Sequence, residues 1–318
     1  MLNFFISRII QSIVVLILIM VVVFIAVRML PGDPIRMYLA SNSQQTYTQE
    51  QIDHLRHEVG LDKPLYEQFI DWVGGIFKGD LGKSILRKEP VTKEIFRRLP
   101  VTAYYGGVAF IFATIIGIPL GIITAVRRGK WVDTLLTLFA YIGITTPTFW
   151  LGLILMYIFG VYLKWLPVMG YTSPFEDLWM SIKQLIMPVI CLSFFTIAAT
   201  ARQTRSSLLE VMRADYIRTA WSKGLRERVV IWRHALKNSL IPIVTLVGMG
   251  VPMVIGGSVF IETVFNLPGI GVLATNAVFN EDYPYVQGVT LIISIVVLIT
   301  NFLVELTYGW LDPRIRYD

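Results

Sequence analysis

The sequence predicts an all-α, polytopic membrane protein with six transmembrane helices. Of its 318 residues, 55% are hydrophobic and only 16% are charged, whereas about 25% are charged in an average soluble domain. The mean hydropathy is +0.63. Six stretches hold the roughly 20 apolar residues that a helix needs to cross the hydrocarbon. The single cysteine, Cys191, lies in one of them, so no disulfide can form within the chain.

The six predicted spans contain no Asp, Glu, Lys, Arg or His. They run over about Ile9–Val27, Val101–Val126, Thr134–Val161, Gln184–Ala201, Leu240–Ile261 and Tyr285–Val304. The first is too long for the apolar part of a signal peptide and has no small-residue cleavage site after it, so residues 1–30 are expected to form a retained anchor helix. Carriers coupled to ions and voltage sensors need intramembrane charges. Spans without such charges favour an energy source outside this chain.

The distribution of basic residues predicts that both termini are cytoplasmic. In that orientation the inner segments hold fifteen Lys and Arg, whereas the two short outer loops hold only Lys164 and Lys183. Short cytoplasmic loops carry such an excess of positive charge. The pI near 9.3 therefore reflects membrane topology, and no nucleic-acid partner is expected.

Residues 31–100 are expected to form an extracytoplasmic lid. This segment has ten acidic and ten basic residues. One helix is predicted over Thr48–Val59, with Thr48 as its N-cap and Gly60 after its end, and a second over Leu65–Phe77. Their apolar faces are expected to pack against each other or on the membrane, and they consist of Ile52, Leu55 and Val59, and of Leu65, Phe69, Trp72 and Ile76.

The run Gly79-Asp80-Leu81-Gly82-Lys83-Ser84 looks like half of a phosphate-binding loop. The full motif needs a glycine where Phe77 stands, and a strand where a helical pattern precedes. A turn is therefore the expected structure.

His54 and His57 are three residues apart on the first of these helices. This spacing could place two imidazoles on one face for a metal ion. Paired histidines on an exposed helix are also common without a metal, and the sequence leaves the choice open. No constellation of a nucleophile and a base occurs, so no catalytic residues are predicted.

Several glycines and prolines interrupt the apolar spans. Gly117 and Gly121 are spaced for close helix approach, and Thr146-Pro147 and Pro188 lie within the third and fourth spans. Such residues either serve packing or line a pathway that must flex. The sequence does not separate these two roles.

A basic, amphipathic connector, Arg213 to Pro242, joins the fourth and fifth spans. Two apolar stripes are expected on two short helices, first Leu209, Met212, Tyr216 and Ala220, then Leu225, Val229, Trp232 and Leu236. Gly224 is expected to end the first helix in a left-handed conformation, which costs other residues about 1 kcal/mol or more. Two roles stay open for this loop of about residues 202–239, namely docking of a protein and contact with anionic lipid.

The sequence resembles a known family, the ABC-importer permeases of the dipeptide/oligopeptide class. The resemblance covers essentially the whole chain, and three sets of residues carry it. The first lies in the connector, the second follows the fifth span, and the third surrounds the lid and resembles the B-type subunit of the permease pair. In order they are Asp215-Tyr216-Ile217-Arg218-Thr219-Ala220 with Lys223-Gly224-Leu225 and Arg233–Asn238; Glu262–Gly271 with Asp282-Tyr283-Pro284 and Val286-Gln287-Gly288; and Arg28–Pro34 with Gly79-Asp80-Leu81-Gly82.

The resemblance implies a type I ABC-importer permease fold, in which residues 101–318 form a five-helix core. It implies a multi-pass subunit of a prokaryotic cytoplasmic (inner) membrane that pairs with a second, C-type permease subunit in the lipid bilayer. Two ATPase subunits would bind ATP and Mg, so this chain would be no enzyme and hold no cofactor. An extracytoplasmic solute-binding protein would deliver peptides, nickel, glutathione or oligosaccharides.

The resemblance also implies that the connector is the ATPase-coupling loop. The residues assigned to it are Asp215, Tyr216, Arg218, Thr219, Ala220, Lys223, Gly224 and Leu225. The general motif of importers begins Glu-Ala-Ala where this chain has Arg218, Thr219 and Ala220, but its glycine is kept as Gly224. The alternative, from another class, is a self-sufficient channel or carrier whose basic loop only contacts lipid.

Overall fold

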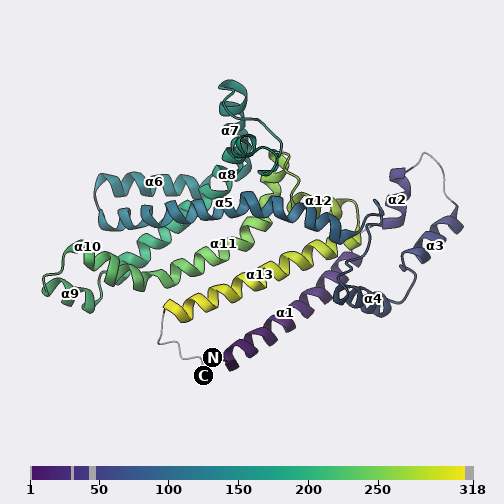
Figure 1. The fold of residues 1–318 in the computed structure, drawn as a ribbon, viewed down its shortest axis with the longest axis horizontal. Helices are drawn as coiled ribbons and strands as arrows, with labels where there is room; N and C mark the ends of the chain where they lie inside the picture. The colour runs from purple at the N-terminus through teal and green to yellow at the C-terminus, as the bar shows by residue number, and fades with distance from the viewer. Residues whose placement is uncertain (1, 30–31, 43–47, 312–318) are drawn as a thin grey trace. The chain divides into compact units, whose positions relative to one another are not determined.

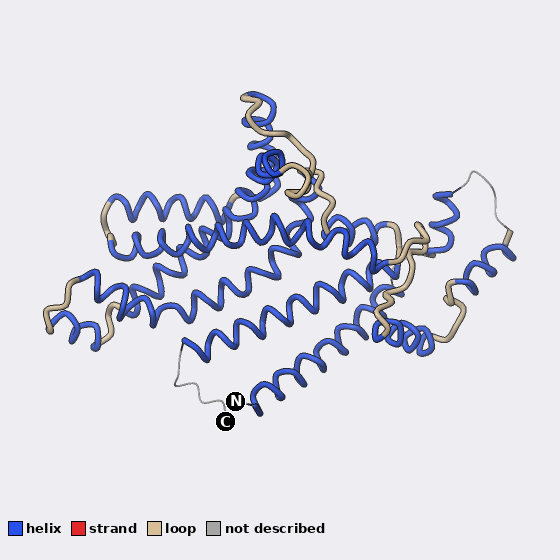
Figure 2. Tube along the Cα trace, viewed as in Figure 1, coloured by secondary structure: helices blue, strands red, loops and turns tan. Residues whose placement is uncertain are grey.

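The computed structural model describes residues 2–29, 32–42 and 48–311, and almost all of its regular structure is helical (Figure 1). No strand occurs in these ranges (Figure 2), where the only strand-like pairing is an isolated bridge between Lys83 and Pro90. The predicted all-α class is confirmed.

Five helices are long and apolar enough to cross a membrane. They are α1 (Leu2–Arg28), α5 (Val91–Val126), α8 (Leu178–Val211), α11 (Leu236–Val264) and α13 (Tyr283–Leu311). The number rises to six if a bent pair is one span, namely α6 (Trp131–Thr145) with α7 (Thr148–Leu155) and the π-helix η1 (Met156–Tyr162). The described residues therefore contain all six predicted apolar segments.

The third predicted span, Thr134–Val161, is not one continuous helix. It bends by 102° between α6 and α7. Proline has no N–H and disfavours the α conformation in the residue before it. Thr146 accordingly has an extended backbone, with φ −76° and ψ 122°, and Pro147 starts a new helix direction.

The chain divides into two compact units, and the larger is built on Ala103–Leu267 and the end of α13 from Val297. In it α8 packs against α6, α7 and α11. Gly117 and Gly121 of α5 face α8, because a Cβ on Gly117 would lie 2.9 Å from Thr200 Cβ and one on Gly121 would lie 2.5 Å from the carbonyl oxygen of Ala201. The small-residue pair thus serves close helix packing.

Buried ionisable side chains occur where the helices extend past the predicted apolar spans. Glu262, near the end of α11, is fully buried and accepts a hydrogen bond from the hydroxyl of Tyr105 in α5. In the first turns of α5, Arg97 and Arg98 donate to the carboxylate of Glu94 at 2.7 and 2.5 Å. Each carboxylate is paired, as burial requires.

The smaller unit comprises Ile6–Thr102 and Pro268–Val296. It contains α2 (Pro34–Asn42), α3 (Gln49–Glu58), α4 (Leu65–Phe77) and α12 (Ile270–Phe279). The two predicted lid helices are confirmed: Thr48 and Gln51 form a capping box at the start of α3, and α4 has the predicted bounds. The nine-residue α2 and ten-residue α12 are too short to give a clear periodic signal.

The two predicted lid faces pack on separate clusters. Side chains Ile52, Leu55 and Val59 of the α3 segment pack against Ile35, Leu39 and Ile85. Phe69, Trp72 and Ile76 of α4 instead pack with buried residues of α1, α5, α12 and α13, and the ring of Phe69 lies 5.1 Å from that of Phe24. Leu65 is 60% exposed, so its assignment to the α4 face is wrong.

The helix α5 begins at Val91, ten residues before the predicted span. Its first turns are amphipathic: Val91 and Ile95 are fully buried, while the intervening charged residues obscure the apolar signal. Before this helix, Gly79 and Gly82 have φ of +75° and +86°, and Asp80 Oδ1 accepts the Gly82 N–H at 2.8 Å. The predicted turn at Gly79–Ser84 is confirmed.

His57 Nδ1 lies 2.6 Å from Asp62 Oδ2. This contact occupies one ring nitrogen of His57, one of the two histidines whose spacing could suit a metal ion. Within the described ranges, no three His, Cys, Asp or Glu side chains gather as a metal site.

Candidate functional site

The connector between α8 and α11 forms a compact surface element at one end of the larger unit (Figure 1). It consists of α9 (Asp215–Ser222), a turn at Gly224, α10 (Glu227–Val229) and the π-helix η2 (Val230–Ala235), which continues directly into α11. The connector therefore lacks an independent second helix, because its last part is the beginning of a long span.

An apolar seat holds α9 on the spans. Ile217 is fully buried and Ala220 is 6% exposed. They pack in one cluster with Leu208 of α8, with Ile122 and Ala125 of α5, and with Val230, Ile231 and Ala235 of η2. Burying one Ile side chain contributes about 1.5–3 kcal/mol. The helix is thus fixed to α5, to α8 and to η2, which continues as α11.

The other face of α9 and the turn after it are open to solvent. Seven of the eight residues predicted for coupling lie there, and they are Asp215, Tyr216, Arg218, Thr219, Lys223, Gly224 and Leu225. The eighth, Ala220, is buried and belongs to the seat. Asp215 and Arg218 pair at 3.7 Å, but their side chains are 97% and 73% exposed, so the pair contributes little and leaves both charges accessible to a partner.

Gly224 ends α9 in the predicted left-handed conformation, with φ +74°. The Gly224 N–H donates to the Trp221 carbonyl at 2.8 Å and the Leu225 N–H to the Ala220 carbonyl at 3.4 Å, which is the Schellman arrangement. A Cβ at this position would meet nothing within 4 Å. The backbone angle alone, and not the space, requires glycine here.

The predicted apolar stripe on α9 is wrong at Tyr216, which is 45% exposed while its neighbour Ile217 is buried. The stripe assumed one helical period from Leu209 to Ala220, but α8 ends at Val211 and α9 starts only at Asp215. The Tyr216 hydroxyl instead accepts a hydrogen bond from Asn238 Nδ2 of α11 at 2.9 Å. It braces α9 against the next span.

The second predicted stripe is wrong at Leu225, Val229 and Trp232, whereas Leu236 packs against the buried cluster as predicted. Val229 and Trp232 are 38% and 56% exposed, whereas Val230 and Ile231 are buried. From Val230 onwards the π-helix η2 (Val230–Ala235) breaks the 3.6-residue period, because its hydrogen bonds run from i to i+5. Leu225 is also exposed, at 38%, and lies on the open side of the turn.

A partly buried ion pair that the sequence did not indicate lies in the same unit. Arg205 of α8 donates to both carboxylate oxygens of Asp133 in α6, from Nε at 2.9 Å and from a terminal nitrogen at 3.0 Å. Asp133 also accepts the Gly129 N–H at 3.0 Å and the Thr137 hydroxyl at 3.3 Å. It therefore ties the turn between α5 and α6 to α8.

Comparison with known proteins identifies the family of this chain. Residues 117–317 match the family described as the binding-protein-dependent transport system inner membrane component, and residues 1–105 match the N-terminal part of such components. The chain belongs to this family. It is a permease subunit of an ABC importer and a multi-pass protein of the inner membrane.

Full-length relatives agree with this assignment. The permease is 39% identical to a protein of Brucella suis that is named as a peptide permease, with 99% of each chain covered. It is 40% identical to the glutathione transport system permease protein GsiC of Pectobacterium atrosepticum, with 100% of each chain covered.

The fold of the permease is also found in a solved importer. The inward-facing MetNI methionine ABC transporter matches with a TM-score of 0.56 and 16% identity, covering 69% of this chain and 96% of that chain. At this identity the match shows the fold alone, and that fold is the type I importer fold. Importers of this kind contain ATPase subunits and more than one permease subunit.

Proposed function

We propose that this permease forms, with a second, C-type permease subunit, the pathway by which an ATP-driven importer moves peptides or a related small solute. Two ATPase subunits supply ATP hydrolysis with their own ATP and Mg, and one of them binds the exposed face of α9. An extracytoplasmic solute-binding protein delivers the solute to the side that carries the lid. This chain hydrolyses nothing and holds no cofactor of its own.

The construction of the α9 surface supports the coupling role most directly. A helix that transmits force must be attached firmly to the membrane spans. Ile217 and Ala220 pack α9 against α5, α8 and η2. Its opposite face offers accessible charges and the exposed ring of Tyr216 to a partner. A displacement of α9 would thus be passed to three membrane helices.

The charge distribution supports cytoplasmic termini and a cytoplasmic α9. Nine Lys and Arg lie between Arg202 and Lys237, against three acidic residues, and such loops stay on the cytoplasmic side. Since ATP is cytoplasmic, this orientation puts the proposed docking surface where ATPase subunits can reach it.

The named solutes of the relatives support a peptide substrate class. One relative is named for peptides and another for glutathione, which is itself a tripeptide. Both solutes carry peptide bonds, so a pathway that accepts the peptide backbone would serve either. Binding measurements with the proposed solute-binding protein would decide among the members of this class.

Replacing Gly224 with valine tests the coupling role. A β-branched residue in the left-handed region costs about 1–2 kcal/mol, and open space around the site leaves backbone strain as the only direct effect. Gly224→Val in the assembled importer is expected to reduce both uptake and solute-stimulated ATP hydrolysis. The matched control is Gly79→Val in the smaller unit, where φ is +75° and nothing lies within 4 Å. If Gly224→Val leaves uptake and ATP hydrolysis intact, the coupling role of this turn is wrong.

The alternative of a self-sufficient channel or carrier gives a different result in liposomes. The purified chain alone, without partner subunits or ATP, would then take up peptides. The importer proposal expects uptake only when the second permease subunit, the ATPases, ATP and the binding protein are all present.

A further inference from the structure

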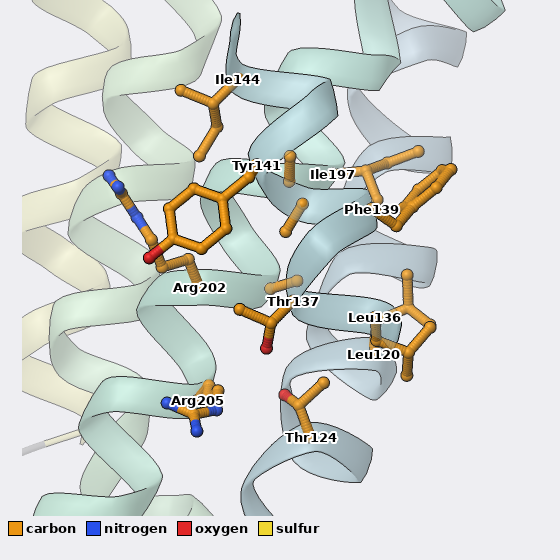
Figure 3. Close-up of a pocket in the computed structure, with 13 residues that line it drawn as sticks. Leu120, Thr124, Leu136, Thr137, Phe139, Tyr141, Ile144, Ile197, Arg202 and Arg205 are labelled. Carbon is orange, nitrogen blue, oxygen red and sulfur yellow. The ribbon is translucent and has the colours of Figure 1, made fainter. Parts of the chain in front are cut away.

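A small apolar cavity lies between α5, α6 and α8 in the larger unit (Figure 3). Its volume is about 80 Å³, and eight of its thirteen lining residues have purely hydrocarbon side chains. In Figure 3 Ile144 lies towards one end of the cavity, and Arg205 and Thr124 lie towards the opposite end. Arg202 lies beside Tyr141 with its guanidinium towards the Ile144 end, so each end of the cavity has one arginine.

Arg202 gives this cavity an available positive charge. It lines the cavity together with Arg205, one turn further along α8. Arg205 is bound to Asp133, whereas Arg202 is exposed and has no hydrogen-bond or ion-pair partner among the residues that the structure describes. An unpaired guanidinium beside an apolar groove favours an anionic group with a hydrocarbon tail.

Further positive charge lies near the end of the cavity that holds Arg205. The turn between α5 and α6 carries exposed Arg127, Arg128 and Lys130. Asp133 holds this turn against α8 through the Gly129 N–H and Arg205. Basic pockets between membrane helices on the cytoplasmic side bind anionic lipid headgroups.

We propose that this cavity is a binding site for an anionic phospholipid of the inner leaflet. The phosphate lies against Arg202, the headgroup extends towards the basic turn, and one acyl chain lies in the cavity beside Leu120, Leu136 and Ala140. A cavity of about 80 Å³ holds roughly five to eight groups of the size of a water molecule or a methylene. It thus accommodates a segment of an acyl chain, and the rest of the chain lies in the bilayer.

The hydrocarbon lining favours a lipid over a peptide solute as the occupant. A peptide backbone enclosed by Leu136, Phe139 and Ile197 would leave its N–H and C=O groups without partners, at a cost of about 1–3 kcal/mol each. An acyl chain has no such groups. The exposed apolar residues Leu135 and Leu138 continue along α6 outside the cavity, so its wall is continuous with an apolar surface.

Native mass spectrometry of the full chain, released from nanodiscs with equal dioleoyl phosphatidylglycerol and dioleoyl phosphatidylcholine, tests the site. The wild type is expected to retain phosphatidylglycerol in preference to phosphatidylcholine. Arg202→Gln is expected to lower this retention about fivefold, the effect of one basic residue at an anionic membrane surface. Arg213→Gln, which makes the same change of charge in an exposed turn beyond α8, should leave it unchanged, and Arg202→Lys should preserve most of it.

Filling the cavity tests the position of the acyl chain. Ala140 lines the cavity, and Ala140→Leu should displace the chain and lower retention of phosphatidylglycerol even though Arg202 is intact. Equal retention by the Arg202→Gln and Arg213→Gln variants, equal retention of the two lipids by the wild type, or normal retention by Ala140→Leu would each overturn the proposal. Displacement of the lipid by a transported peptide would assign the cavity to the solute pathway instead.

Discussion

The close approach of α5 and α8 predicts that adding a single methyl group will destabilise the permease at Gly121 but not at Gly107. A Cβ on Gly121 would lie 2.5 Å from the carbonyl oxygen of Ala201 and would also overlap the side chain of Thr204. A Cβ on Gly107, in the same helix, would meet nothing within 4 Å. Gly117 is intermediate, because its nearest neighbour, Thr200 Cβ, would lie 2.9 Å away.

The magnitude follows from two opposing effects. Alanine stabilises a helix by roughly 0.5–1 kcal/mol relative to glycine, whereas overpacking costs typically 1–3 kcal/mol. At Gly121 one obstacle is a backbone carbonyl, which cannot rotate away, so Gly121→Ala is expected to destabilise by about 1–2 kcal/mol. Gly117→Ala would meet the carbonyl oxygen of Ile197 at 3.0 Å and should destabilise by less than Gly121→Ala, and Gly107→Ala should stabilise slightly.

Thermal unfolding can be followed through the single cysteine. Cys191 is fully buried, so a thiol-reactive fluorophore reports its exposure as the larger unit unfolds. At roughly 2–4 °C for each kcal/mol, Gly121→Ala should melt about 2–8 °C below wild type. Two results would refute the close packing of α5 on α8. One is a Gly121→Ala protein that melts at or above the wild-type temperature, and the other is a Gly107→Ala protein that melts at a lower temperature than Gly121→Ala.

Two further predictions concern buried carboxylates. Arg205→Leu should cost about 3 kcal/mol because it leaves Asp133, with its side chain 9% exposed, without its partner, whereas Asp133→Ala should cost only about 1 kcal/mol because Arg205 is 31% exposed. The double variant should recover part of the loss, and additive losses in a thermal cycle would show that the pair is not coupled. Burial raises the pKa of Asp282 above 3.8, although the Ser84 hydroxyl donates a hydrogen bond to its carboxylate. The folded protein therefore binds this proton more tightly than the unfolded chain does. The free energy of unfolding should accordingly fall as pH rises from about 3.8 through the raised pKa. Asp282→Asn should flatten this slope in melting curves across pH, and an unchanged slope would contradict the assignment.

The sequence indicated the apolar segments and the lid helices well, because both depend on local signals. Thr48 and Gln51 form the capping box that their spacing predicts, and Gly224 has the left-handed backbone that its place after α9 predicts. Such features need only a few neighbouring residues, so the sequence alone carries them.

Features that depend on a break in periodicity were not predicted. The interruption between Val211 and Asp215 moved the buried position from Tyr216 to Ile217, and the π-helix at Val230–Ala235 moved the next buried face. A hydropathy pattern continues across both breaks without a sign of them. Pro147 marked the break in the third span, but the angle of 102° depends on how α7 packs against α8.

Long-range contacts were invisible for a different reason. Asp133 and Arg205 are 72 residues apart, and each looked like one more charge beside an apolar span. The cavity beside Arg202 likewise exists only because α5, α6 and α8 come together. Counts of charge along the chain predict an orientation but do not show which charges are paired.

Protection of α9 by the ATPase subunits tests the central claim most directly. In a Cys191→Ala background, Thr219→Cys places a thiol on the exposed face of α9 and Glu67→Cys places a matched thiol on the exposed side of α4. Maleimide labelling of Thr219→Cys should slow several-fold when the ATPase subunits bind, and labelling of Glu67→Cys should not change. If the complex assembles and both thiols are labelled as fast as in the isolated permease, α9 is not the coupling surface.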